Sequence, residues 1–252
     1  METKAGKLLV KVYDSRQSMG AAAAKEVAEK IRELLKDRKD INVLFAAAPS
    51  QNEFLATLVE DASIEWNRIN AFHLDEYVGI DKDAPQGFVN FLKARIFDKV
   101  PFKSVNTLNA NAASPEEECK RYQKLLEENP IDIACIGIGE NGHIAFNDPH
   151  VAFFDDAKLV KIVDLDQKCR QQQVNDGCFA KIDDVPTNAF TLTVPAITNS
   201  KYIYCIVPAK TKAEAVFNTV KGEIRERVPA SILRLHSNAV LYTDKDSASL
   251  IL

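Results

Sequence analysis

The sequence predicts an α/β fold, with a parallel sheet covered by helices on both faces and a single domain over residues 1–252. Two observations predict it. Short apolar runs alternate with stretches of helical period, which is the pattern of strand–helix–strand units joined by right-handed crossovers. No internal repeat, low-complexity stretch or long linker divides the chain, so one domain is the simplest organisation.

The elements follow one another in a regular order. The first strand is predicted at residues 8–13, a run rich in leucine and valine, and a helix follows at 18–35, where apolar residues recur every three or four positions. Further strands are predicted at 42–46, 69–74, 131–138, 189–194, 202–207 and 239–242, and further helices at 53–59, 88–97, 116–127 and 212–220. Because ligands of open parallel sheets bind beyond the carboxyl ends of the strands, the residues directly after each strand are the candidates for a site.

Composition favours a cytoplasmic protein that binds neither nucleic acid nor membranes. Hydrophobic residues make up 46% of the chain, which is enough for a sizeable core, and the net charge is −4. Nucleic-acid binding needs a basic face that displaces counterions. The start of the chain lacks a signal-peptide pattern, and no apolar run reaches membrane-spanning length. The five cysteines show no CxxC spacing, so neither a disulfide framework nor a metal site is expected.

Two stretches are candidates for binding an anion. Residues 46–52 join a predicted strand to a helix, and small residues there let backbone amides approach a ligand closely. Ser50 or Asn52 can add a side-chain donor, and Gln51 lies between them. The alternative is that Ser50 or Asn52 only caps the helix. Lys212 opens a predicted helix, where a positive charge opposes the helix dipole unless an anion binds nearby. An ordinary surface lysine is the alternative.

Two other stretches carry groups suited to proton transfer. Asp75 and Glu76 follow the strand 69–74, and adjacent carboxylates offer a proton acceptor beside a second charge. A solvated acidic loop is the alternative. His143 lies in the glycine-rich stretch 137–149, and an imidazole can gain and lose a proton near neutral pH. Asp148 is close enough in sequence to hydrogen-bond that imidazole. The alternative is a structural histidine, which is the more common role of a lone histidine.

Together these stretches resemble the glucosamine-6-phosphate deaminase family, whose members convert glucosamine 6-phosphate to fructose 6-phosphate and ammonia. Residues 74–79 (LDEYVG) resemble one family signature, and residues 137–149 (GIGENGHIAFNDP) resemble the family's GxGxDGHIAFNEP. Residues 229–236 (PASILRLH) are similar to its PASxLQxH segment. The match runs in the same order over nearly the whole chain. It implies a Rossmann-like parallel α/β fold and a reaction without a metal or organic cofactor.

The resemblance also implies roles for individual residues. Asp75 falls where the family places the base that moves a proton between C2 and C1 of the open-chain sugar. His143 falls on the residue assigned to opening the sugar ring, and Asp148 takes the place of the glutamate that supports it. Lys212 matches a phosphate-binding lysine, and Ser50 lies in the segment that matches the phosphate loop.

The sequence departs from the family pattern at four places. Asn141 stands where the family has aspartate, and Asp148 is one methylene shorter than the family's glutamate. The loop 47–52 lacks the glycines of the family's TGGTP-like sequence. Gly177 aligns with a phosphate-binding arginine, although Arg170 lies close enough to take that place. These changes predict a divergent member that uses a related hexosamine phosphate or isomerises without releasing ammonia.

The predicted substrate is therefore a small sugar phosphate. The predicted catalytic residues are Asp75, His143, Asp148 and Asn141, and the predicted substrate- or phosphate-binding residues are Ser50, Gln51, Asn52, Glu76, Gly139, Arg170 and Lys212. The family contains both monomers and larger assemblies, so a homo-oligomer stays open.

Two other functions fit parts of the sequence. A 6-phosphogluconolactonase shares the fold and a related GHxA segment, but residues 144–149 (IAFNDP) fit the deaminase version better than the SLFPG typical of lactonases. A non-catalytic sugar-phosphate sensor is the other alternative, and the altered phosphate loop favours it. A sensor needs neither a base nor an acid, and we expect no helix-turn-helix before the first strand, so the enzyme is the preferred interpretation.

Overall fold

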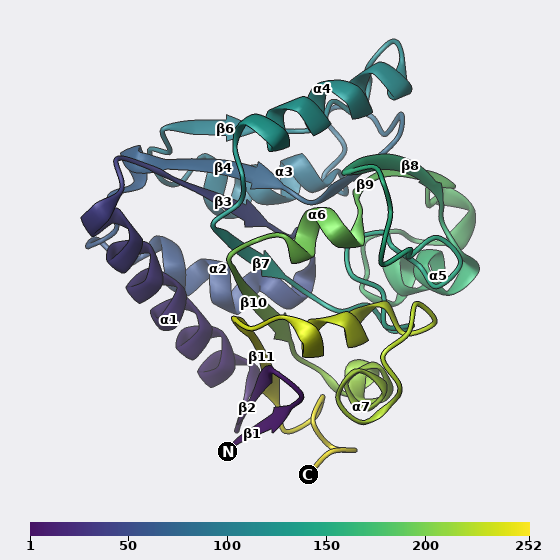
Figure 1. Cartoon of the computed structure of the whole chain (residues 1–252). Coiled ribbons are helices and arrows are strands. Elements are labelled where there is room, and N and C mark those ends of the chain that lie inside the picture. The colour runs from purple at the N-terminus through teal and green to yellow at the C-terminus, as the bar shows by residue number, and fades with distance from the viewer.

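The computed structural model describes residues 1–252, which form one large sheet and one small sheet (Figure 1). The large sheet has the strand order β1-β2-β11-β10-β7-β3-β4-β6, and every neighbouring pair is parallel except β1 with β2. Its strands are β1 (Glu2–Ala5), β2 (Leu8–Tyr13), β3 (Ile41–Phe45), β4 (Ile69–His73), β6 (Ser104–Asn106), β7 (Ile133–Ile136), β10 (Tyr202–Val207) and β11 (Ala239–Asp244). The predicted α/β fold with a mostly parallel sheet is confirmed.

Helices cover both faces of the large sheet. One face carries α1 (Arg16–Asp37), α2 (Asn52–Val59) and α3 (Phe88–Leu92), and the other carries α4 (Pro115–Glu128), α6 (Val194–Thr198) and α7 (Ala213–Lys221). Successive strand residues point to opposite faces, so Val43 and Phe45 enter the first core whereas Leu44 enters the second. This two-sided burial explains why the strands appear in the sequence as continuous apolar runs.

The small sheet is antiparallel and has the order β5-β9-β8. Its strands are β5 (Asp75–Tyr77), β8 (Val160–Asp164) and β9 (Asn188–Leu192), and α5 (Gln167–Asn175) connects β8 to β9. The run 189–194, predicted among the strands of the parallel sheet, thus forms β9 in a separate sheet. That run ends early because Val194 and Pro195 begin α6, with proline at a position that needs no hydrogen-bond donor.

Close contact between α1 and α2 fixes the start of the loop that follows β3. A Cβ atom at Gly20 of α1 would lie 2.7 Å from the Cβ atom of Glu53, so only glycine allows this approach. Arg16 begins α1 and donates hydrogen bonds to Glu53 and to the carbonyl of Pro49. The first turn of α1 and the loop before α2 are thereby held together.

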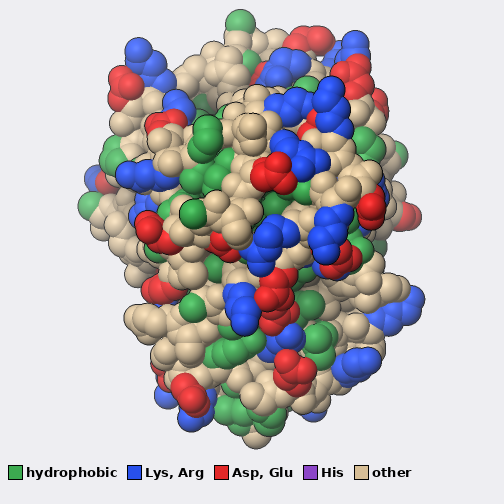
Figure 2. Space-filling view, turned by 90° about the vertical axis from the view of Figure 1, so that its left-hand side faces the viewer, with side chains coloured by type: hydrophobic (Ala, Val, Ile, Leu, Met, Phe, Trp, Pro, Cys, Tyr) green, Lys and Arg blue, Asp and Glu red, His purple; other side chains and the backbone are tan.

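The surface carries charges of both signs. On the side of the molecule on which α1 lies, lysine and arginine side chains alternate with acidic ones, and neither sign forms a large continuous area (Figure 2). None of the helices combines the length and the apolar character that crossing a membrane would require.

Candidate active site

A narrow cleft lies at the carboxyl ends of β3, β4, β7 and β10, where the open parallel sheet predicts it. Its volume is ≈ 100 Å³, and it is lined by Arg16, residues 46–50, Leu74, Asp75, Phe88, residues 137–139, His143, Ala145, Phe146, Gln172, Gln173, Asp176, Pro208, Ala209, Thr211 and Lys212. Five sequence-predicted residues, Ser50, Asp75, Gly139, His143 and Lys212, therefore meet in one place although they are far apart in the chain.

Asp75 is a buried carboxylate at the wall of the cleft. It begins β5 directly after β4, and its side chain is 6% exposed. Burial raises its pKa well above the ordinary aspartate value, and the neighbouring charge of Glu76 raises it further. No protein group donates a hydrogen bond to this carboxylate. A carboxylate with raised proton affinity, facing a cleft and free of internal partners, is suited to accept a proton from a bound molecule.

His143 forms a hydrogen-bonded pair with Asp148, and its ring lines the cleft. Its Nδ1 lies 3.0 Å from Asp148 Oδ1, so the Nε2 atom remains available to a ligand. Burial alone would raise the pKa of Asp148, but the hydrogen bonds from His143 and Asn141 hold it below the ordinary value. The carboxylate is therefore ionised beside the imidazole. The shorter aspartate side chain reaches the ring at normal hydrogen-bond distance.

Asn141 supports this pair without touching the imidazole ring. Its Oδ1 accepts a hydrogen bond from the main-chain N–H of His143, and its Nδ2 donates to Asp148 at 2.9 Å and to Asp166 at 3.0 Å. The main-chain N–H of Asp166 also donates to Asp148. Through these contacts the Asn141 amide holds the main chain of His143 and the carboxylate of Asp148.

The opposite part of the cleft carries donors and a buried positive charge. Lys212 is 5% exposed and forms no salt bridge. Burial lowers the pKa of its ammonium group, although Asp176 and Glu140 oppose this effect. Gln51 does not line the cleft, but its Nε2 donates to Ser50 Oγ and thereby orients that hydroxyl. An anion in the cleft would give the buried ammonium group the partner that the protein does not supply.

The turn before Lys212 is held in an unfavourable conformation. Ala209 has a φ of 81°, which favours glycine, and its N–H donates to both carboxylate oxygens of Asp244. Asp244 lies at the end of β11 and is buried. This anchor offsets the strain and fixes the start of the turn that presents Lys212 to the cleft.

Four sequence-predicted binding residues do not line the cleft, namely Gln51, whose contacts are given above, and Asn52, Arg170 and Glu76. Asn52 accepts a hydrogen bond from Arg95, and Arg170 donates to the carbonyls of Ile182 and Val185, so both have structural partners. Glu76 points to the other side of β5, because successive strand residues alternate, and it binds backbone N–H groups there. These corrections follow from the side chains' partners, which sequence proximity does not reveal.

Several cleft residues were not predicted from the sequence. Arg16, Thr211 and residues Gln172, Gln173 and Asp176 of the α5 region all line it. Gln172 accepts a hydrogen bond from the N–H of Glu140 and so links α5 to the glycine-rich loop. Arg16 belongs to α1, whose predicted start lay two residues further on, and α5 has no clear apolar period. No simple pattern marked either segment.

A metal-ligand geometry is present near His143 but is chemically unfavourable. Ligand atoms of His143, Asp148 and Cys169 lie within 4.8 Å of one another. Burial raises the pKa of the Cys169 thiol well above its ordinary value, and the charges of Asp148 and Asp166 raise it further. A protonated thiol is a poor ligand, and Asp148 already accepts three hydrogen bonds. The cluster is better suited to hydrogen bonding than to holding a metal ion.

Comparison with known proteins places the chain in a family. Residues 14–242 match the family of glucosamine-6-phosphate isomerases and 6-phosphogluconolactonase. The chain belongs to this family. A glucosamine-6-phosphate deaminase of Bacillus cereus (strain B4264) is 33% identical over 220 residues, which cover 87% of this chain and 82% of that protein. One of Streptococcus sanguinis (strain SK36) is 36% identical over 206 residues, covering 82% and 85% of the two chains.

Solved structures agree with this assignment. The structure of a monomeric glucosamine-6-phosphate deaminase matches with a TM-score of 0.86 and 31% identity, covering 96% of this chain and 99% of that one. A 6-phosphogluconolactonase of Thermotoga maritima matches with a TM-score of 0.75 at 22% identity, covering 94% and 99% of the two chains. At that identity the lactonase likeness demonstrates the shared fold alone.

The contact between Gly139 and His143 gives a first prediction. A Cβ atom at Gly139 would lie 2.1 Å from His143 Nε2, so Gly139→Ala must displace the imidazole or shift the loop. We expect a fall in kcat of about 100-fold or more for any reaction that uses His143, because small misplacements of a reacting group cost this much. Steady-state kinetics measure the loss, and circular dichroism checks the fold. Unchanged kcat in Gly139→Ala would argue against a catalytic His143.

Proposed function

We propose that this protein is an amino-sugar phosphate isomerase and deaminase, which converts glucosamine 6-phosphate or a related hexosamine 6-phosphate to a ketose phosphate with release of ammonia. The observation that carries the proposal is the position of Asp75, His143 and Lys212 on one cleft. A base, an acid and a buried cation are the three groups that the reaction of a phosphorylated aldose requires. The relatives named glucosamine-6-phosphate deaminase support the same activity.

Asp75 is the proposed base for isomerisation. It takes the C2 proton of the open-chain amino sugar and returns a proton to C1, while one proton of the amino group passes to the carbonyl oxygen. The aldehyde carbon is thereby reduced as C2 is oxidised to the imine. Water then adds to the imine carbon and ammonia leaves, which gives the ketose phosphate. A buried carboxylate can both take and return this proton, because burial raises the pKa of Asp75 and so makes its protonated form easier to reach than it is in water.

His143 is the proposed group for opening the sugar ring. Ring opening requires a proton on the ring oxygen and removal of the proton from the anomeric hydroxyl. Nδ1 is occupied by Asp148, so Nε2 is the atom that exchanges the proton. Asp148 and Asn141 fix the orientation of the imidazole from behind and do not contact the substrate in this proposal.

Lys212 is the proposed phosphate contact. Ser50 and Thr211 supply hydroxyl groups on the same cleft, and Arg16 adds a second positive charge at its edge. A phosphate group there would restore a charged partner to the buried ammonium group. We infer further that the chain acts as one domain in the cytoplasm, where its five unpaired cysteines would stay reduced.

Product analysis tests the proposed reaction directly. Incubation with glucosamine 6-phosphate should release ammonia and a ketose phosphate in equal amounts, measured by coupled enzymatic assays. Galactosamine 6-phosphate and unaminated hexose 6-phosphates define the substrate class, and 6-phosphogluconolactone tests lactone hydrolysis. Hydrolysis of the lactone without ammonia release would overturn the proposal in favour of a lactonase. Binding without turnover of any of these compounds would indicate a sensor.

Replacement of the base should stop the reaction but not binding. Asp75→Asn removes the proton acceptor while it keeps size and shape, so kcat should fall at least about 1,000-fold. The dissociation constant for the substrate should change less than about fivefold, as measured by calorimetry. Asp81→Asn, an exposed carboxylate in the next loop, is the matched control and should leave kcat unchanged. Full turnover by Asp75→Asn would remove the proposed role of this carboxylate.

Replacement of the buried lysine should weaken phosphate binding selectively. Lys212→Ala should raise KM for the phosphorylated substrate about 10- to 100-fold, because the lost contact is a charge-assisted one in a dry site. Affinity for the unphosphorylated amino sugar should not change. Lys210→Ala removes an exposed lysine of the same turn and serves as control. An equal loss of affinity for both sugars would contradict a phosphate contact.

A further inference from the structure

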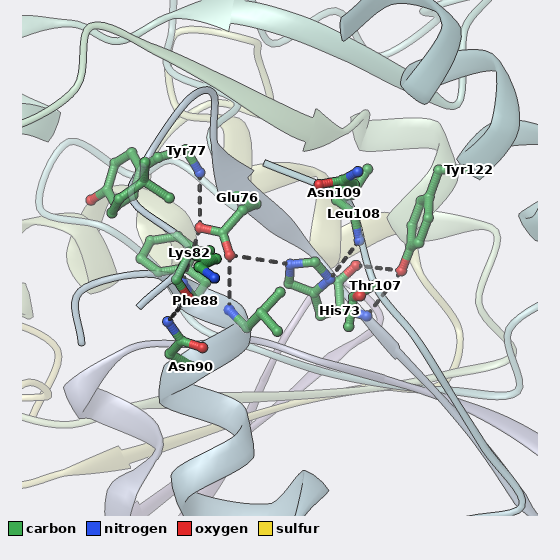
Figure 3. A network of polar contacts seen from close by, with 12 residues as sticks. His73, Glu76, Tyr77, Lys82, Phe88, Asn90, Thr107, Leu108, Asn109 and Tyr122 are labelled. Atoms are coloured by element: carbon green, nitrogen blue, oxygen red, sulfur yellow. Dashed lines mark hydrogen bonds and ion pairs between the residues drawn. The ribbon is translucent and has the colours of Figure 1, made fainter. Parts of the chain in front are cut away.

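Two carboxylates stand side by side on β5 but face opposite ways. Asp75 faces the cleft. Glu76 faces a second pocket, between β5, α3 and the loop that follows β6 (Figure 3). Both side chains are buried, with Glu76 only 1% exposed. Two buried negative charges at adjacent positions repel each other. The arrangement is therefore unfavourable unless the surrounding groups stabilise the charge of one carboxylate and not that of the other.

Glu76 has the partners that stabilise a negative charge. Its Oε1 accepts hydrogen bonds from the N–H groups of Tyr77 and Phe88, both at 3.0 Å, and its Oε2 accepts one from Val89 at 2.9 Å. Phe88 and Val89 form the first turn of α3, where a helix offers free N–H groups and favours an anion. The carboxylate therefore caps α3 from a neighbouring strand. Burial raises the pKa of Glu76, but these three hydrogen bonds oppose the rise.

His73 closes the remaining side of Glu76 without neutralising it. Its Nδ1 accepts a hydrogen bond from the N–H of Leu108, so the neutral ring carries its proton on Nε2. That Nε2 lies 4.0 Å from Glu76 Oε2 and has no other partner (Figure 3). Burial lowers the pKa of His73 to about 3, so the ring is neutral at physiological pH. Tyr122 fixes the strand at this point through hydrogen bonds with the backbone N–H and C=O of His73.

No other charged group compensates either carboxylate. Neither Asp75 nor Glu76 forms an ion pair with a lysine or an arginine. The titratable groups around the pair are His73 of β4, Tyr77 of β5, Asp81, Lys82 and Lys93 around the cavity beside Glu76, Tyr122 of α4, and His143, Cys169, Asp176 and Lys212 in or beside the cleft. Lys82 pairs instead with Asp83.

The two carboxylates therefore differ in one respect that decides their charges. Glu76 accepts three backbone hydrogen bonds, and Asp75 accepts none. We propose that Glu76 is a positioning residue, which holds a fixed negative charge behind Asp75 and so makes Asp75 a stronger base than burial alone would. This inference rests on the proposed function of Asp75 as the base. It replaces the sequence-based expectation that Glu76 binds the substrate.

The arrangement has a direct chemical consequence. The C2 proton of an amino aldose is weakly acidic, so a base of ordinary aspartate strength would take it slowly. A fixed anion nearby raises the proton affinity of Asp75 without adding a group that competes for the proton, because the backbone amides keep Glu76 ionised. The same anion raises the energy of ionised Asp75, so the protonated form, which must exist while the proton moves from C2 to C1, becomes easier to reach.

The pH dependence of turnover tests the proposal. In Glu76→Gln the fixed charge is absent, so the acid limb of the kcat/KM profile should move to lower pH by about one unit, with a lower plateau. Glu76→Asp keeps the charge but retracts it from the amides of α3, so it should lose stability while its acid limb stays near that of the wild type. Glu118→Gln is the matched control, since Glu118 is also buried and accepts a backbone hydrogen bond, from Asn109. It should not move the limb.

Each outcome decides the question. An unmoved limb in Glu76→Gln, or an equal shift in Glu76→Asp, would show that Glu76 acts only through structure and would overturn the proposal. A wild-type titration covers the case in which Glu76→Gln does not fold. With ¹³C-labelled carboxyl groups, assigned by Asp75→Asn, NMR should show Asp75 gaining a proton above the ordinary aspartate range while Glu76 remains ionised. The reverse order would overturn the proposal. This titration needs no substrate, so its result does not depend on whether the ammonia assay detects turnover.

Discussion

The structure depends on keeping one carboxylate, that of Asp75, buried and without a hydrogen-bonding partner. Burying a carboxylate without a hydrogen-bonding partner costs free energy, and the elements around Asp75 hold it in this position. The chain leaves β4 at His73 and enters β5 at Asp75, so a single residue separates the parallel sheet from the small antiparallel sheet. Pairing with Thr191 of β9 fixes the register of β5. A shift by one residue would exchange the directions of Asp75 and Glu76.

The small sheet fixes the position of Asp75. Without the pairing of β5 with β9, Asp75 would stand in the loop that follows β4 and not in a paired strand. Here β9 holds β5 from one side, and the hydrogen bonds between Glu76 and α3 hold it from the other. Phe146 of the glycine-rich loop packs against Tyr77 with ring centroids 5.4 Å apart, and so connects the strand of Asp75 to the loop of His143. Asp75 and His143 are thus positioned relative to each other through packed elements.

The sequence was sufficient for the parallel part of the fold and for the residues that end its strands. Continuous apolar runs marked the central strands because these strands are buried on both faces, and Asp75, His143 and Lys212 stood directly after or near such runs. It was not sufficient for β5, which has only three residues, two of them acidic, or for β8 and α5, which lack a clear period. Their structure comes from pairing with distant segments. The direction of the Glu76 side chain also depends on distant segments. Two of the N–H groups that bind it belong to residues twelve and thirteen positions further along the chain.

Asn141 shows how a departure from the family pattern can preserve a site. Its amide nitrogen donates to Asp148 and Asp166 at the same time, and its oxygen accepts from the backbone of His143. An aspartate at this position could not donate to either carboxylate and would place a third negative charge beside Asp148 and Asp166. The amide is therefore the residue that fits when Asp166 occupies this place. A neutral donor and two carboxylates here give His143 a single anionic partner at hydrogen-bond distance.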